Sequence, residues 1–101
     1  MSTLHTVNKS PFATNALLSC LMHCKDGDAV LMIEDGVYGA LNGSGVAEVV
    51  VAQAKSVSIY ALTGDVAARG LEGKTLTEVG SVDYAGFVDL VAKHDRTQNW
   101  L

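Results

Sequence analysis

The apolar positions along the chain alternate between short runs and segments of helical spacing. Four runs rich in β-branched residues, at residues 4–7, 29–33, 57–62 and 79–82, have the length and composition of buried strands. The segments between them are longer and mix apolar with polar positions. This alternation is typical of an α/β fold built on a mainly parallel sheet, and we expect four or five strands with helices on both faces.

The first two helical segments have recognisable ends. Ser10 as N-cap and Pro11 at the first helical position predict a helix that closes before the Asp26-Gly27 turn. After Asp35-Gly36 the pattern is helical again, but the sequence Asn42-Gly43-Ser44-Gly45 predicts a kink or loop before a second piece over 46–55. The three valines at 49–51 suit a strand equally well, so both alternatives stay open for that piece.

Two shorter helices are predicted in the second half of the chain. The segment 63–70 reads as a short helix that Gly70 ends. Asp83 is placed to cap a last helix, on which the apolar side chains share one face: Tyr84, Phe87, Val88 and Val91.

The length and composition limit the chain to one small domain over residues 1–101. The chain has 101 residues, of which 49% are apolar and 18% charged, below the roughly 25% charged residues of ordinary soluble domains. Its mean hydropathy is +0.25. Because a domain of this size exposes much of its surface, an apolar excess predicts that another subunit covers part of it.

Charge and targeting signals exclude several classes of function. Seven basic and eleven acidic residues give a net charge of −4, and the basic residues form no cluster, so direct binding to nucleic acid or to an anionic membrane is disfavoured. No uncharged run reaches the ~20 apolar residues of a membrane span, and no secretory signal is visible. We therefore expect a cytoplasmic protein with free thiols.

The predicted carboxyl edge of the sheet does not look like a cofactor site. Acidic residues follow the strands there, which disfavours phosphate, and Gly39, Gly43 and Gly45 match neither the dinucleotide fingerprint nor a P-loop. A catalytic carboxylate pair at Glu34-Asp35 and Asp83 is less favoured than ordinary turns and caps. We expect no cofactor.

Cys20, His23 and Cys24 form the one dense cluster of chemically capable side chains in the sequence, at positions i, i+3 and i+4 of a helix. A structural zinc site needs four ligands, and no second Cys/His pair completes the set, so we expect no metal. The spacing is not that of a C-x-x-C redox pair. A single thiolate that carries sulfur as a persulfide needs only one accessible cysteine.

An inert role for both cysteines is an open alternative. Cys20 and Cys24 fall on the same apolar stripe as Leu17 and Leu21, which predicts that the thiols face the core. The other histidines, His5 in the first strand and His94 at the end of the last helix, have structural explanations.

Several short motifs, in order along almost the whole chain, resemble the DsrH/TusB family of sulfur-relay subunits. The first is Leu4-His5-Thr6-Val7-Asn8-Lys9-Ser10-Pro11-Phe12, a strand followed by a helix entry. The others are Gly27-Asp28, Glu34-Asp35-Gly36-Val37, Ile59-Tyr60-Ala61-Leu62, Ala68-Arg69-Gly70-Leu71, Asp83-Tyr84, Phe87-Val88, Lys93-His94 and Trp100. The resemblance implies a small Rossmann-like three-layer sandwich.

The resemblance also implies partners and a role. Family members join DsrE-like and DsrF-like subunits in an α2β2γ2 heterohexamer that relays persulfide sulfur to a DsrC/TusE-like carrier. One branch serves tRNA 2-thiouridine synthesis, and the other serves dissimilatory sulfur oxidation. Cys20 matches a first-helix cysteine of the sulfur-oxidising branch, which is typically missing from the tRNA branch. We therefore predict that Cys20 is the persulfide acceptor of a sulfur-oxidation relay. The alternatives are a non-catalytic scaffold subunit and a tRNA-thiolation subunit.

Overall fold

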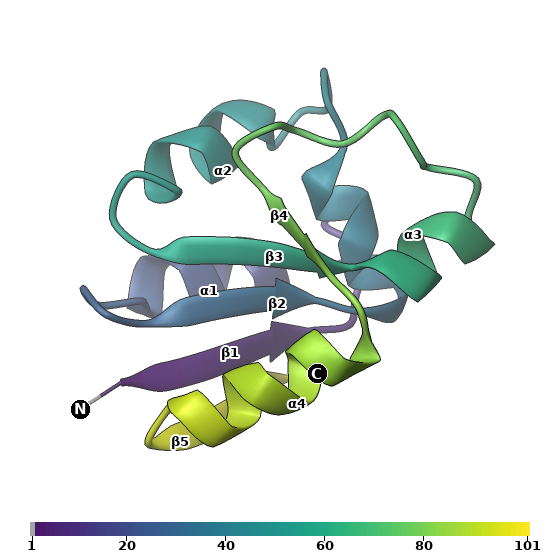
Figure 1. The fold of residues 1–101 in the computed structure, drawn as a ribbon. Helices are drawn as coiled ribbons and strands as arrows, with labels where there is room; N and C mark the ends of the chain where they lie inside the picture. Colours follow the sequence, from purple (N-terminus) through teal and green to yellow (C-terminus); the bar gives the residue numbers. More distant parts are fainter. Residues whose placement is uncertain (1) are drawn as a thin grey trace.

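The computed structural model describes residues 2–101 and confirms the predicted α/β architecture (Figure 1). Five strands form one sheet in the order β4-β3-β2-β1-β5, and every neighbouring pair is parallel. The strands are β1 (Thr3–Val7), β2 (Ala29–Met32), β3 (Ser58–Leu62), β4 (Gly80–Val82) and β5 (Arg96–Trp100). The helices are α1 (Ala16–His23), the 3-10 helix η1 (Glu34–Ala40), α2 (Ala47–Gln53), α3 (Thr63–Ala68) and α4 (Tyr84–Lys93).

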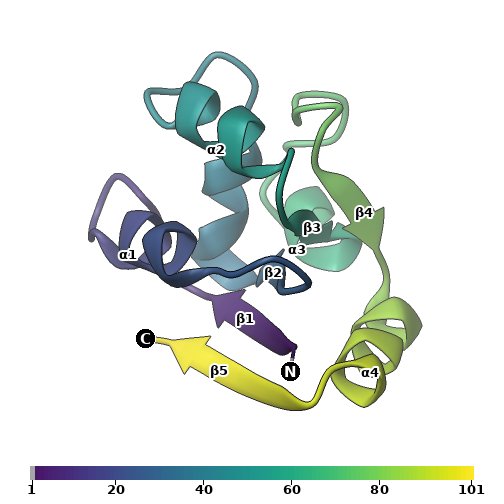
Figure 2. The ribbon, with the colours of Figure 1, turned by 90° about the vertical axis from the view of Figure 1, so that its left-hand side faces the viewer.

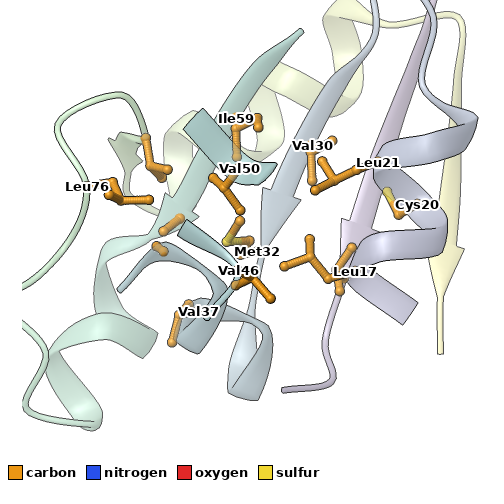
Figure 3. Packing of buried hydrophobic residues seen from close by; sticks show 14 of the residues in the cluster. Leu17, Cys20, Leu21, Val30, Met32, Val37, Val46, Val50, Ile59 and Leu76 are labelled. Carbon is orange, nitrogen blue, oxygen red and sulfur yellow. The ribbon is translucent and has the colours of Figure 1, made fainter. Parts of the chain in front are cut away.

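Helices cover both faces of the sheet and make it the middle of three layers. Figure 2 shows α1 and α2 on one side of the sheet and α4 on the other. The larger apolar cluster lies under α1, η1 and α2, where Leu17 and Leu21 pack toward Val30 and Met32 (Figure 3). A smaller cluster around Leu4, Leu31 and Leu90 lies under α4. The alternation of side chains along β1 thus sends odd-numbered residues toward α1 and even-numbered ones toward α4.

The predicted start of the first helix is wrong. Ser10 and Pro11 form a separate turn, in which the Ser10 carbonyl accepts hydrogen bonds from the N–H groups of Ala13 and Thr14. The helix itself begins five residues later, at Ala16. Cys20 is therefore in the middle of a two-turn helix, and Cys24 is the residue that ends it, in an extended conformation.

The interrupted second segment is confirmed as two pieces. Its first piece is the 3-10 helix η1, the loop around Gly43 follows, and the valine-rich piece is the helix α2 rather than a strand. Gly36, in η1, lies so close to β1 that a Cβ atom there would be 2.0 Å from the Val7 carbonyl oxygen. A side chain at this position is thus sterically excluded.

The last helix is capped as predicted, but only Phe87 of its predicted apolar face packs against the core. The Asp83 carboxylate accepts a hydrogen bond of 2.8 Å from the Gly86 N–H. Leu90 is the residue that α4 buries, whereas Tyr84 is 72% exposed and Val88 51% exposed. The helix contacts the sheet along a narrow stripe: Phe87 is partly buried against the smaller cluster and the Tyr84 ring packs edge-on against that of Phe87, whereas Val88 and Val91 stay largely exposed.

β5 is the strand that the hydrophobic pattern did not predict. Its sequence is polar apart from Trp100, because it is an edge strand whose side chains are largely exposed. It pairs with β1 in parallel, with Val7 opposite Trp100. Among residues 2–101, no helix has the length and apolar character of a membrane span.

Candidate thiol site

His5, Cys20 and Cys24 meet on the α1 side of the sheet. One ligand-type atom from each, an imidazole nitrogen and two Sγ atoms, lies within 4.8 Å of the other two. β1 supplies the histidine, the middle of α1 supplies Cys20, and the end of α1 supplies Cys24. The chain leaves α1 at Cys24 and reaches Asp28, which directly precedes β2. The cluster is thus near the amino ends of the strands, away from the carboxyl edge where Rossmann-like folds hold cofactors.

Both ring nitrogens of His5 are engaged. The Trp100 indole N–H donates to Nδ1 at 3.0 Å, and Nε2 lies 2.9 Å from the Asp28 carboxylate. An indole N–H only donates, so Nδ1 is the accepting nitrogen and the ring proton is on Nε2, directed at Asp28. The imidazole is 5% exposed and fixed in orientation by these two bonds.

Asp28 is a buried carboxylate with three donors around it. It accepts hydrogen bonds from the Thr3 N–H at 3.0 Å and the Lys25 N–H at 3.1 Å, in addition to the His5 ring. Burial alone would raise the pKa of this carboxyl, but the hydrogen bonds outweigh burial and hold the pKa below its ordinary value. Asp28 therefore joins β1 to the loop between α1 and β2.

The two cysteines differ in exposure and acidity. Cys20 is fully buried beside Leu17 and Leu21 (Figure 3), while Cys24 is half-buried. A side-chain hydrogen bond between Cys20 and Cys24 and, as a smaller effect, burial raise the pKa of the Cys20 thiol far above its ordinary value. The same hydrogen bond from Cys20 lowers the pKa of Cys24, against the opposing effects of burial and of Asp28. Cys24 is therefore the more acidic thiol of the pair.

When the Cys24 thiol is protonated, it makes a hydrogen bond to the backbone instead of to the Cys20 thiol. Its Sγ–H donates to the Cys20 backbone carbonyl at 3.2 Å, as expected one helical turn apart. Ionisation of Cys24 breaks that bond and lets the Cys20 thiol donate to the Cys24 thiolate instead.

A cleft of about 760 Å³ opens beside the cluster. Its lining includes His5, Asp28 and Trp100 together with three side chains at its rim, His23, Lys25 and Arg96. Trp100 lies between the two histidines, with ring centroids 6.2 Å from His5 and 5.3 Å from His23. The indole covers His5 from the edge of the sheet.

The structure separates the residues that the sequence grouped. His23 is exposed and hydrogen-bonds to the Ser19 carbonyl at 2.8 Å, so it is beside the cluster but outside it.

At the carboxyl edge of the sheet, Asp35 forms an ion pair of 2.9 Å with Arg69, and the Asp65 carboxylate accepts a hydrogen bond from the Glu34 N–H.

Sequence reasoning did not identify His5, Asp28 and Trp100 as members of this site. A histidine in the middle of a fully buried strand was the available signal, because buried histidines need hydrogen-bond partners. The partners themselves come from residues 23 and 95 positions away along the chain, and local patterns do not pair such positions.

Solved structures confirm the fold. The crystal structure of ychN protein from E. coli superimposes with a TM-score of 0.75 at 14% identity, covering 98% of this chain and 99% of that one. A protein of unknown function from Methanobacterium thermoautotrophicum, MTH1491, gives a TM-score of 0.74 at 15% identity, with 97% of both chains covered.

Sequence relatives define the family. Protein TusB of Escherichia coli O81 (strain ED1a) and Protein TusB of Shigella flexneri are each 37% identical over 99 residues, covering 96% of this chain and 99% of theirs. The family described as DsrH like protein matches residues 9–97. With near-complete coverage in both comparisons and the fold in agreement, the chain belongs to the DsrH/TusB family.

Proposed function

We propose that this chain is a subunit of a sulfur-relay complex that supplies sulfur for tRNA thiolation. The observation that carries the proposal is the 37% identity to TusB proteins over nearly the full length of both chains. Sulfur relay is the role that the family resemblance implies. The first-helix cysteine favoured the sulfur-oxidising branch, but the TusB relatives support the tRNA branch better.

We further propose that the two cysteines take part in the relay as a pair. Cys20 was the predicted persulfide acceptor, and that role stays a prediction. In the isolated chain Cys20 is fully enclosed, whereas Cys24 reaches the surface. Sulfur from an external donor therefore reaches Cys24 first, and Cys20 lies behind it.

The transfer step needs no oxidant. The Cys24 thiolate attacks the outer sulfur of a donor persulfide, R–S–SH, so that the new S–S bond of Cys24–S–SH forms while the donor leaves as R–S⁻. A thiolate of a DsrC/TusE-like carrier then attacks the same outer sulfur and releases the Cys24 thiolate. The sulfane sulfur is transferred twice, and Cys24 ends as the thiolate with which it began.

Assembly with DsrE-like and DsrF-like subunits, in an α2β2γ2 heterohexamer, belongs to the same proposal. Support comes from large apolar side chains that the single chain leaves exposed: Phe12, Met22, Val49, Tyr84, Val88, Val91 and Leu101. An exposed set of this kind is typical of a subunit that buries surface against partners.

A scaffold role is the second candidate. The complete burial of Cys20 favours it, because an enclosed thiol with a raised pKa is a poor nucleophile. In that case the chain shapes the complex and a sister subunit carries the sulfur.

Intact mass spectrometry after polysulfide treatment separates the two candidates. The assembled complex is compared as wild type, Cys20→Ser and Cys24→Ser, with reductant to reverse the adduct. We expect a reducible sulfur adduct on wild type that Cys24→Ser abolishes and Cys20→Ser reduces. An adduct lost only in Cys20→Ser would instead make Cys20 the acceptor, and a chain that never gains sulfur while a partner does would establish the scaffold role.

A further inference from the structure

We propose that His5, Cys20 and Cys24 form a zinc-binding site, in which Asp28 orients the histidine through a hydrogen bond to its other ring nitrogen. Among residues 2–101 these three side chains place their ligand-type atoms within 4.8 Å of one another. Two thiolates and one imidazole are the ligand types that Zn²⁺ takes in proteins. Helix α1 alone offers too few ligands for zinc, and His5 joins them from β1, a strand distant from α1 along the chain.

The geometry requires only a small adjustment. Zinc bonds of about 2.0–2.3 Å in a tetrahedral site hold neighbouring ligand atoms about 3.4–3.8 Å apart. The longest distance in the cluster must therefore shorten by about 1.0–1.4 Å from 4.8 Å. Cys24 is the ligand best placed to move, because it ends α1, is half-buried, and has only one hydrogen bond, to the Cys20 carbonyl.

The hydrogen bonds of His5 point to Nδ1 as the ring nitrogen that would take a metal ion. The Nε2–H is directed at Asp28. In zinc sites, the ring nitrogen of a histidine that does not bind the metal is commonly hydrogen-bonded to a carboxylate in this way. Asp28 is itself fixed by two backbone N–H groups. Nδ1 carries no proton, and its hydrogen bond from Trp100 is what a metal ion would replace.

Charge favours zinc over a monovalent soft ion. Binding releases one proton from each thiol to solvent, and the two thiolates then balance the charge of Zn²⁺. Cu⁺ with the same ligands would leave a net negative charge at a position where Cys20 is fully buried. A water molecule completes the tetrahedron, as in zinc sites with three protein ligands.

This site goes beyond the proposed relay function. Zinc and a sulfane sulfur need the same lone pairs of Cys24, so a zinc-bound subunit does not accept sulfur. Metal binding is a property of the single chain, and it is measured without donor, carrier or partner subunits. Its outcome is therefore separate from that of the sulfur-transfer experiment.

The test is a zinc titration of the reduced full-length chain under anaerobic conditions, in competition with a chromophoric chelator. We expect one equivalent of Zn²⁺, and at least a tenfold loss of affinity in His5→Gln, Cys20→Ser and Cys24→Ser. His23→Gln and His94→Gln are the matched controls, since both histidines are outside the cluster, and their affinity should equal that of wild type. Trp100→Phe frees Nδ1 and should bind at least as tightly.

Two further measurements guard against misfolded variants. Co²⁺ should give the thiolate charge-transfer absorption of a tetrahedral site with wild type, and Zn²⁺ should protect both cysteines of wild type from alkylation. The proposal is overturned if wild type binds no stoichiometric zinc. It is equally overturned if His5→Gln folds, by circular dichroism, and binds zinc as tightly as wild type, since the two thiols alone would then hold the ion.

Discussion

At the scale of single residues, the hydrogen bonds around Asp28 determine how the thiol site is held together. One carboxylate accepts from Thr3, Lys25 and His5, and His5 in turn accepts from Trp100. The sequence indicated that Cys20 and Cys24 are close, because helical spacing is local. It gave no indication of His5 or Trp100 beside them, because those contacts depend on strand order and on a polar edge strand that the pattern did not reveal.

Asp28→Ala should destabilise the chain strongly. The substitution leaves two backbone N–H groups and the His5 ring N–H without their acceptor at a buried position, and we expect a loss of about 2–4 kcal/mol in the free energy of unfolding. Urea denaturation measures it. Asp26→Ala is the matched control, since Asp26 is exposed in the same loop, and it should change the free energy by less than about 0.5 kcal/mol. Equal losses in both variants would show that Asp28 has no special role in this network.

At the scale of elements, most strands and helices follow from the periodicity, and the exceptions have physical causes. Ser10 and Pro11 are a good helix start, yet the turn they form closes on itself and α1 begins at Ala16. α4 has an apolar face wider than the stripe that packs on the sheet. Local signals identify the ends of elements, whereas the packing of distant segments decides which face is buried.

Gly36→Ala should disrupt the contact between η1 and β1. The added Cβ would be 2.0 Å from the Val7 carbonyl oxygen, so backbone must move, and we expect a loss of at least about 2 kcal/mol. Gly64→Ala in α3 is the matched control, because its Cβ meets no atom within 4 Å and alanine favours a helix, so it should be neutral or stabilising by up to about 1 kcal/mol. Thermal unfolding of both variants checks this, and a Gly36→Ala chain as stable as wild type would contradict the close approach.

At the scale of the whole molecule, the exposed apolar side chains support the proposal that the chain is a subunit of a larger complex. The sandwich buries one apolar cluster on each face of its sheet, yet it leaves several large apolar side chains exposed, and its thiol site has one buried and one half-buried cysteine. The fold class and the family were predictable from the sequence. The arrangement of the site was not, because His5 meets the two cysteines only once α1 packs on β1, and Trp100 reaches His5 only once β5 pairs with β1.

The most direct test of the account is the 2-thiouridine content of tRNA in the protein's own host after deletion of this chain. Mass spectrometry of digested tRNA should show that the modification at the wobble uridine falls strongly, that the wild-type chain restores it, and that Cys24→Ser restores it less than Cys20→Ser does. Unchanged 2-thiouridine in the deletion strain would contradict the proposed role in tRNA thiolation. Full restoration by the Cys24→Ser variant would contradict the role of its thiol and leave the scaffold role.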